Sequence, residues 1–433
     1  MQDSQIPAVE NAAAPSSVKT RFDGSKAIAL IGDICFAFWL FTEAVLAHTT
    51  ISQIALVLVM LASFALVLTK KKACFSYWMI LSALLIIWNT LGIYFWSIDA
   101  AVTKDAVQTF VVNFVFFAAV FQYLVLRGNF ERVLTMYLLA FCAIIAYLVI
   151  MIGPANILVT RLGWFIGINS NKIGILTTFA LAISLYKVFN ARYWALIPLF
   201  LSLAGEVLAL SFTALAGAAV IVVVFILIAW PKYWPLKILA MLVLGVGASI
   251  ILVKFWPLAT VKYNDTIAAL TTPPQPFGSS IVHRRWLIQF GFQHFLERPV
   301  TGFGSNCFHL LEGAARGNEG TYAHNNYIEL LVDGGAVQFV LYYAISVIAL
   351  IRAFRGKHEK KLTARKALAV LYIAMLVIEF GTVVCFERER LIIPILLIAS
   401  TFPDPSVAGG KWLKTDFHLR KRKQPQHQEA IEV

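Results

Sequence analysis

The most restrictive feature of this chain is a series of twelve apolar runs, most of them long enough to cross a bilayer. A helix needs about 20 apolar residues to span a hydrocarbon layer of about 30 Å. Inside that layer each backbone N–H and C=O must be paired within the protein, so each run is predicted to be a helix. The predicted spans are residues 27–48, 50–69, 74–96, 107–126, 133–153, 171–189, 193–211, 214–230, 237–254, 328–353, 366–385 and 390–403.

The composition agrees with this prediction and excludes other classes of protein. Of the 433 residues, 60% are hydrophobic and 14% are charged, whereas an average soluble domain has roughly 45–50% and about 25%. So few charges cannot cover a globule, which excludes a soluble enzyme, a coiled coil and a disordered protein. The sequence therefore predicts an all-α polytopic membrane protein. Its five cysteines have no metal-ligand spacing, and Cys307 and Cys385 are expected on the outer side and unpaired.

The basic residues indicate which side of the membrane each connection faces. They gather before the first run and in every second connection, for example at residues 70–72 and 352–366. Cytoplasmic segments collect Lys and Arg, so both termini are predicted to be cytoplasmic. Much of the net charge of +13 has this cause. The basic residues 420–423 are interpreted as an anchor at anionic lipid rather than as a nucleic-acid site.

These assignments divide the chain into five parts. They are an N-terminal tail (1–26), nine spans (27–254), a large outer loop (255–325), three spans (326–403) and a basic tail (404–433). Loops of this length are usually functional or disordered. Residues 284–296 are predicted to form an amphipathic helix that ends before Pro299 and lies on the membrane surface or across the mouth of the bundle.

The first of three outer stretches with candidate functional residues begins at Arg161. Asn169 or Ser170 is predicted to cap the sixth span, whose N-terminal N–H groups would attract an anion. Arg161 and Lys172 add positive charge to the same stretch. The alternative interpretation is a capped turn in which Trp164 merely lies at the membrane interface.

The second stretch contains the paired residues Arg284 and Arg285. Two arginines on an outer loop run against the bias of positive charge toward the cytoplasm. Arginine is the preferred side chain for bidentate phosphate binding. The alternative is that an interfacial helix uses both arginines to contact lipid headgroups.

The third stretch surrounds His324 at the start of the tenth span. Asn326 and Glu329 are three residues apart before an apolar run, which is a capping-box arrangement. The helix dipole would keep His324 neutral, so that it could act as a general base. Glu329 and Asp333 are expected to pair with outer arginines. The alternative is that a single histidine at a helix start is structural.

The predicted topology brings these three stretches to one side of the membrane. Several cations, outward-facing helix N-termini and one base together predict a site for a phosphate or diphosphate, with one proton-abstracting residue. No metal or nucleotide-binding motif accompanies them. The acids within predicted spans raise the alternative of a transporter, although they are scattered: Asp33, Glu43, Glu206 and Glu379.

The same stretches resemble the bacterial O-antigen ligase family, which shares a superfamily with O-antigen polymerases and protein O-oligosaccharyltransferases. The resemblance covers about residues 27–403. The matching segments are Gly163-Trp164-Phe165 with Asn169-Ser170-Asn171 and Gly174, after Arg161; Arg284 followed by Pro299-Val300-Thr301-Gly302-Phe303-Gly304; and His324-Asn325-Asn326-Tyr327 through Glu329 and Gly335. The chain departs from the family at Phe212, which stands where a basic residue is common. Arg285 or Lys172 is a candidate for the missing contact.

The resemblance implies a GT-C-like glycosyltransferase of the bacterial inner membrane, with a periplasmic active site and no cofactor. The donor would be undecaprenyl diphosphate carrying O-antigen, and the acceptor a sugar hydroxyl of lipid A–core. The transfer would be metal-independent and inverting, with His324 as base and Arg161, Arg284 and Arg285 on the diphosphate. The residues expected to support the site are Asn325, Asn326, Tyr327, Glu329 and Lys172.

Two alternatives to the ligase remain at this point. A polymerase or protein O-oligosaccharyltransferase of the same superfamily would use the same three motifs, although the compact loop favours the ligase. A secondary transporter or flippase would place its essential charges at mid-bilayer, for example at Glu206 or Glu379, rather than at the outer rim.

Overall fold

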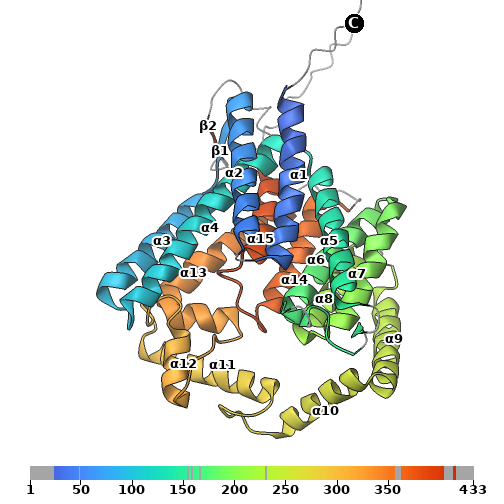
Figure 1. Cartoon of the computed structure of the whole chain (residues 1–433), viewed down its shortest axis with the longest axis vertical. Coiled ribbons are helices and arrows are strands. Elements are labelled where there is room, and N and C mark those ends of the chain that lie inside the picture. The colour runs from blue at the N-terminus through green and yellow to red at the C-terminus, as the bar shows by residue number, and fades with distance from the viewer. Residues whose placement is uncertain are drawn as a thin grey trace, which may run out of the picture.

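A computed structural model describes residues 24–47, 49–153, 156–157, 159–164, 167–229, 232–355, 362–403 and 413–415. Most of the predicted N-terminal tail, most of the basic tail including residues 420–423, Phe165, and residues 356–361 lie outside the described residues. In the described part nearly all regular structure is helical, as Figure 1 shows. The strands β1 (Ala73–Phe75) and β2 (Leu413–Thr415) pair in parallel. The chain is an all-α polytopic membrane protein, as predicted.

A helix lies at each of the twelve predicted apolar runs. Eight of the described helices are long and apolar enough to span a membrane, namely α1–α6, α9 and α13. The other four are shorter, so the count of twelve spans stays a prediction. The twelve helices are α1 (Gly24–Val45), α2 (Thr50–Lys70), α3 (Tyr77–Phe95), α4 (Ala100–Arg127), α5 (Phe130–Ile152), α6 (Ser170–Phe189), α7 (Leu196–Ala209, after a 3-10 turn at Tyr193–Ala195), α8 (Phe212–Ala229), α9 (Trp234–Phe255), α13 (Asn326–Phe354), α14 (Ala364–Ile378) and α15 (Arg388–Thr401).

The helix at the eleventh run ends earlier than predicted, at Ile378 rather than Cys385. Asn326 at the start of α13 holds the following residues in a loop. Its backbone N–H donates to the carbonyl of Glu379 (2.9 Å), and its side-chain oxygen accepts from the N–H groups of Val384 (3.0 Å) and Cys385 (3.1 Å). A buried amide that satisfies these backbone groups outside a helix removes the need for helical hydrogen bonds there.

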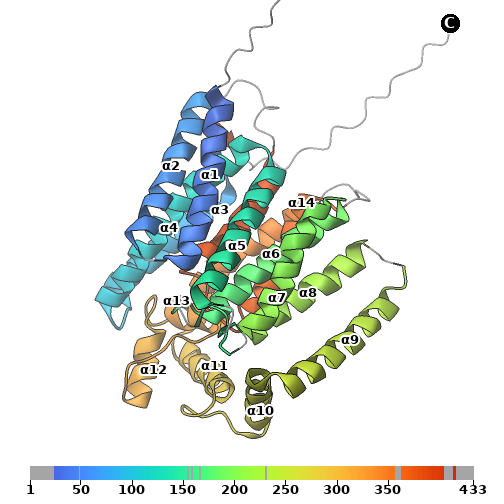
Figure 2. The same cartoon turned by 45° about the vertical axis from the view of Figure 1, so that its right-hand side comes forward.

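The bundle has two distinct ends. At one of them, called here the loop end, lie the three helices of the large loop, at the lower edge of Figures 1 and 2. At the opposite end β1 pairs with β2, and Asn190 after α6 donates to the carbonyl of Leu362 before α14 (3.2 Å). The α5–α6, α7–α8 and α14–α15 connections come together at the loop end. The three outer stretches of the sequence are therefore gathered on one side of the bundle.

The large loop forms three helices, two more than predicted. They are α10 (Pro257–Thr271), α11 (Ser280–Glu297) and α12 (Phe308–Arg316). Helix α11 contains the predicted amphipathic stretch and ends before Pro299. Its Leu287 and Phe290 belong to a core that also contains Phe308 and Ile328. A Cβ on Gly291 would lie 2.3 Å from Cγ2 of Ile328, so glycine allows α11 to pack closely across α13.

A kink in α13 fastens the large loop to the bundle. Gly334 and Gly335 have non-helical backbone angles, and the helix carbonyls before them are free to accept other donors. Phe303 N–H donates to the carbonyl of Val332 (2.9 Å). A Cβ on Gly335 would lie 2.1 Å from the carbonyl oxygen of Val300, so only glycine permits this approach. The Pro-Val-Thr-Gly-Phe-Gly segment, residues 299–304, thus connects the large loop to α13.

Candidate functional site

Side chains from several separate segments line a cavity of about 430 Å³ at the loop end. The segments are the α5–α6 connection, the start of α6, the α7–α8 turn, α10 and α11. Three lining side chains are basic and none is acidic, so we call it the cationic cavity. Its lining residues are Arg161, Asn171, Leu210, Phe212, Thr213, Lys262, Ser280, Ile281 and Arg284.

Arg161 is held in the wall of the cationic cavity by the end of α7. Its guanidinium donates to the carbonyls of Ala209 (3.1 Å) and Leu210 (3.2 Å) and to the side-chain oxygen of Asn171 (3.3 Å). Free carbonyls at a helix C-terminus carry partial negative charge and so favour a cation. Burial and the charge of Arg284 lower the pKa of Arg161, but a guanidinium remains protonated in proteins.

Arg284 reaches the cationic cavity from the first turns of α11. One terminal nitrogen donates to the carbonyl of Gly381 in the α14–α15 connection (3.2 Å). Its Nε is buried and has no hydrogen-bond partner in the described part of the chain. Leaving such a donor unpaired costs about 1–3 kcal/mol. Burial also lowers the pKa of Arg284. Both effects would be relieved by an anion in the cavity.

Lys262 on α10 is the third cation, and the sequence analysis did not identify it. Burial and the charges of Arg161 and Arg284 lower its pKa, whereas Asp265 on the same helix acts in the opposite direction. Its ammonium forms no ion pair or hydrogen bond with another residue in the ranges that the structure describes. The only sequence indication was a lysine one turn away from an aspartate in a loop of otherwise mixed composition.

Two cations that the sequence assigned to the site lie elsewhere. Arg285 is exposed and donates to the carbonyls of Ala269 (2.9 Å) and Thr272 (3.2 Å), so it ties the end of α10 to α11 instead of facing the cavity. Lys172 pairs with Glu389 of α15 (2.9 Å) and is not among the cavity residues. Adjacent helical positions point about 100° apart, which is why Arg284 and Arg285 have different surroundings.

His324 lies in the loop before α13 with a left-handed backbone angle (φ 53°). Its ring packs on Tyr322 at 4.1 Å between centroids. Neither ring nitrogen hydrogen-bonds to another of the described residues. Burial, then the charges of Arg284 and His283, lower the pKa of His324 to about 3. The imidazole is thus neutral near pH 7, as expected, but mainly because of burial and nearby cations.

The charge of Arg284 acts both on His324 and on the other two cations of the cationic cavity. It lowers the pKa of Arg161, of Lys262 and of His324. It also opposes the burial that raises the pKa of Tyr322, whose ring is 38% exposed. The structure therefore brings Arg161, Arg284 and His324 into one electrostatic neighbourhood, although they are far apart in sequence.

The neighbours of His324 position the loop rather than line the cavity. Asn325, not Asn326, caps α13: its side-chain oxygen accepts from the N–H groups of Tyr327 (3.0 Å) and Ile328 (3.1 Å). The predicted capping box was therefore offset by one residue. Asn326 is fully buried, and Tyr327 donates from its hydroxyl to a carbonyl of α14. Both side chains hold the loop that contains His324 against the end of α14.

The two acids of the third stretch have no arginine partners among the described residues, which corrects the prediction. Glu329 accepts the backbone N–H of Ala323 (2.6 Å). Asp333 accepts three backbone N–H groups at the start of α12, including that of Asn306 (2.6 Å). Both carboxylates are buried. Glu329 thus fixes the residue next to His324, and Asp333 anchors α12.

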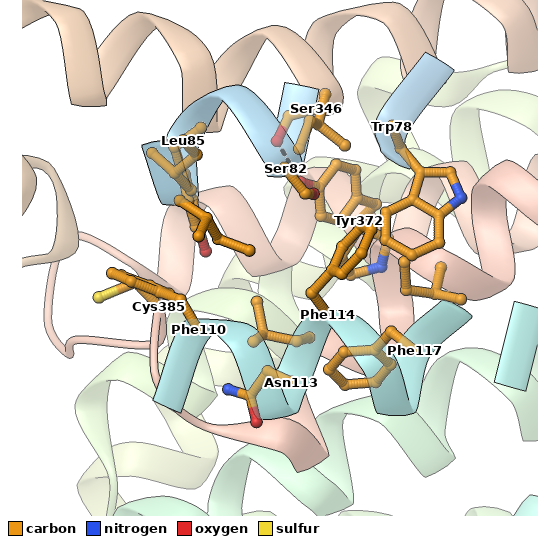
Figure 3. Close-up of a pocket in the computed structure, with 16 residues that line it drawn as sticks. Trp78, Ser82, Leu85, Phe110, Asn113, Phe114, Phe117, Ser346, Tyr372 and Cys385 are labelled. Atoms are coloured by element: carbon orange, nitrogen blue, oxygen red, sulfur yellow. Dashed lines mark hydrogen bonds between the residues drawn. The ribbon is translucent and has the colours of Figure 1, made fainter. Parts of the chain in front are cut away.

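A second, apolar cavity of about 670 Å³ lies inside the bundle, among α3, α4, α13, α14 and α15 (Figure 3). Aromatic side chains such as Phe110, Phe114 and Trp78 surround it, and none of its lining residues is acidic or basic. The carboxylate of Glu206, in another part of the bundle, accepts a hydrogen bond from the hydroxyl of Thr178 (2.6 Å). Glu379 accepts from Tyr343 and Asn326. These acids therefore do not mark a charged path through the described bundle.

No group of three or more His, Cys, Asp or Glu side chains among the described residues is arranged to hold a metal ion. Cys307 and Cys385 are both buried and both carry free thiols. Cys307 contacts the hydroxyl of Thr103 (3.5 Å). The cysteines therefore belong to the packing of the bundle and of the large loop.

A family model described as O-antigen ligase matches residues 197–343. The match runs from α7 through the large loop into α13, and so includes Lys262, Arg284 and His324 but not Arg161. It is narrower than the stretch over which the sequence motifs were compared. No curated protein matches the chain.

Proposed function

We propose that this chain is an O-antigen ligase, a membrane glycosyltransferase, because a family model described as O-antigen ligase matches residues 197–343. It would transfer O-antigen from undecaprenyl diphosphate to a sugar hydroxyl of lipid A–core. The observation that carries this proposal is the cationic cavity, whose described lining contains three cations and no carboxylate and whose Arg284 acts on the neutral imidazole of His324. The loop end would face the periplasm of a bacterial inner membrane, and both termini the cytoplasm.

The cationic cavity supplies what departure of a diphosphate requires. As the anomeric C–O bond breaks, negative charge grows on the leaving diphosphate. Arg161 and Arg284 are already fixed by carbonyls on other segments, so little reorganisation is needed to stabilise that charge. The Nε–H of Arg284 is buried without a partner among the described residues, and it would donate to a phosphate oxygen once the guanidinium turns toward the cavity.

His324 supplies the base for the acceptor. A neutral ring nitrogen accepts the proton of the sugar hydroxyl while the oxygen attacks the anomeric carbon from the face opposite the diphosphate. One C–O bond forms, one C–O bond breaks, and the proton passes to His324. The anomeric configuration is inverted. Because the cations lower the pKa of the imidazolium, it returns the proton readily to solvent or to the released diphosphate.

A polymerase or protein O-oligosaccharyltransferase would use the same chemistry with another acceptor, and it is the main alternative. The transporter alternative has less support. Its expected acids, Glu206 and Glu379, are bonded to neighbouring side chains in the packed bundle, while the cations without partners lie at the loop end.

Purified protein in liposomes tests the proposal directly. Lipid-linked O-antigen is supplied with lipid A–core, with a second lipid-linked glycan, or with a protein acceptor. A ligase modifies only lipid A–core, and His324→Ala should lower that transfer by about 10²–10⁴-fold. The matched control is His309→Ala on α12. Normal transfer by His324→Ala would remove the histidine from the mechanism, and product with either other acceptor would favour the corresponding alternative.

A further inference from the structure

We propose that Lys262 is a third ligand for the donor's diphosphate, supplied by α10 to the cationic cavity that Phe212 of α8 also lines. The inference rests on the proposed function, which it deepens. It assigns part of the donor site to a helix of the large loop. Neither residue of the sequence-based suggestion, Arg285 or Lys172, fills this place.

The first observation is the arrangement of the cavity wall. Arg161 and Arg284 contribute two guanidiniums, and Lys262 contributes an ammonium from a third segment, α10. The start of α8 contributes Phe212, which is 52% exposed although it is aromatic. An exposed phenyl ring gives an anion no hydrogen-bond donor, and Leu210 and Ile281 of the same wall give none from their side chains either. At the start of α8 the positive charge is thus missing, and Lys262 of α10 provides a positive charge to the same cavity.

The second observation is that Lys262 has no counterion in place. Asp265 is its one favourable charge, and the two arginines act against its protonated form. Like charges brought together in a half-buried cavity repel one another, and this repulsion costs stability unless an anion compensates it. The donor's diphosphate, esterified at both ends, carries two negative charges, and a third develops as the anomeric C–O bond breaks, so the three cations are fully compensated by the leaving diphosphate. A site for a neutral sugar would not need them.

The third observation is the way α10 is fixed. Arg285 donates two hydrogen bonds to carbonyls at the C-terminal end of α10. The residue next to it, Arg284, faces the cavity. The same turn of α11 therefore carries one diphosphate ligand and holds the helix that carries another. These two hydrogen bonds explain how Lys262, on a peripheral helix, is kept in a fixed position relative to Arg161 and Arg284.

The test compares variants of the detergent-purified full chain in two assays. Binding of inorganic pyrophosphate is measured by calorimetry, and donor KM and kcat are measured in liposomes. A hydrogen bond to a charged group is worth enough to change affinity by about ten- to hundredfold. Lys262→Ala should therefore raise both the pyrophosphate Kd and the donor KM by that factor, with kcat less affected. Lys262→Arg should retain most of the binding.

Moving the lysine from position 262 to position 212 makes the test specific. Phe212→Lys in the Lys262→Ala background should restore pyrophosphate binding to within about threefold of the original chain, a small fraction of the expected loss. The matched control is Lys254→Ala on the exposed face of α9, which should change neither assay. Rescue by Phe212→Lys cannot arise from a misfolded single variant.

The outcomes separate this inference from the proposal on which it rests. If Lys262→Ala binds pyrophosphate as the original chain does, while Arg284→Ala does not bind it, Lys262 is not a ligand and the proposed function stands. If Arg161→Ala and Arg284→Ala also bind normally, the cavity is no diphosphate site and both fail. Loss in Lys262→Ala without rescue by Phe212→Lys would overturn the idea that the charge substitutes across the cavity.

Discussion

Two clusters of basic side chains in this molecule differ in whether the protein completes them. At the end of the bundle opposite the large loop, Arg127 (3.1 Å) and Arg132 (2.8 Å) form ion pairs with Asp33 of α1. The hydroxyl of Tyr123 also donates a hydrogen bond to Asp33. At the loop end, Arg161, Arg284 and Lys262 surround a cavity that contains no carboxylate.

The difference teaches where to look for a ligand. A buried charge must be paired or it is strongly destabilising. At Asp33 the partner is part of the chain, so the cluster is fully explained by folding. In the cationic cavity the carbonyls of Ala209, Leu210 and Gly381 orient the arginines without neutralising them. The missing negative charge is therefore expected from a bound substrate.

The largest expected effect contrasts one arginine from each cluster. Arg284→Lys should lower kcat/KM for the donor by about 10²–10³-fold, because lysine lacks the planar fork that contacts two phosphate oxygens. Arg127→Lys should leave kcat/KM unchanged for the folded protein. Liposome kinetics normalised to folded protein measures both. Equal activity of the two variants would erase the proposed distinction between the clusters.

The next effect concerns stability at the opposite end of the bundle. Asp33→Asn leaves two guanidiniums without their carboxylate and should destabilise the protein by about 3–5 kcal/mol, the range for breaking a buried pair. The thermal midpoint of the detergent-solubilised protein should fall clearly, while donor KM stays constant. The exposed Lys104→Ala on α4 serves as control. A raised donor KM in Asp33→Asn would show that the two clusters are coupled.

The pH dependence sharpens the link between His324 and the cavity. Burial and neighbouring cations lower the pKa of His324 to about 3, so the base loses its proton at lower pH than usual and stays neutral above that. Activity should therefore show no acid decline near pH 6.5, the ordinary histidine value. Arg284→Gln removes one opposing charge and should move the decline upward in pH. A decline at pH 6.5 in the original chain would contradict the described electrostatics.

The smallest expected effect comes from Arg285. Because it holds α10 to α11 and does not face the cavity, Arg285→Ala should raise donor KM by only about twofold to tenfold, comparable to losing one ordinary hydrogen bond. Circular dichroism should show unchanged helix content. A loss as large as that of Arg284→Lys would restore Arg285 as a direct ligand of the diphosphate.

The sequence predicted the helices well because long apolar runs have few alternatives in a membrane. It also predicted that Arg161, Arg284 and His324 share one side of the membrane, and the structure brings these three residues together. It could not distinguish Arg284 from Arg285, because the direction of each depends on how α11 packs. Lys262 was missed for a related reason, since α10 reaches the cavity only through tertiary contacts.

The capping error at α13 has a different origin. Asn325 and Asn326 are chemically equivalent in the sequence, and a pattern of residue types cannot decide between them. In the structure Asn326 is committed to the backbone of residues 384 and 385, so Asn325 takes the cap. The carboxylate of Glu329 was likewise assigned to arginines because backbone donors such as Ala323 N–H are invisible to composition.

The glycine kink of α13 has a mechanical consequence. The kinked part of α13 accepts hydrogen bonds from the segment that follows α11, and α13 begins two residues after His324. His324 and Arg284 are therefore both held by α13, whereas Lys262 lies on another helix, α10. The two hydrogen bonds from Arg285 to the end of α10 set the position of Lys262 relative to that pair, so their loss would free α10 while His324 and Arg284 stay together.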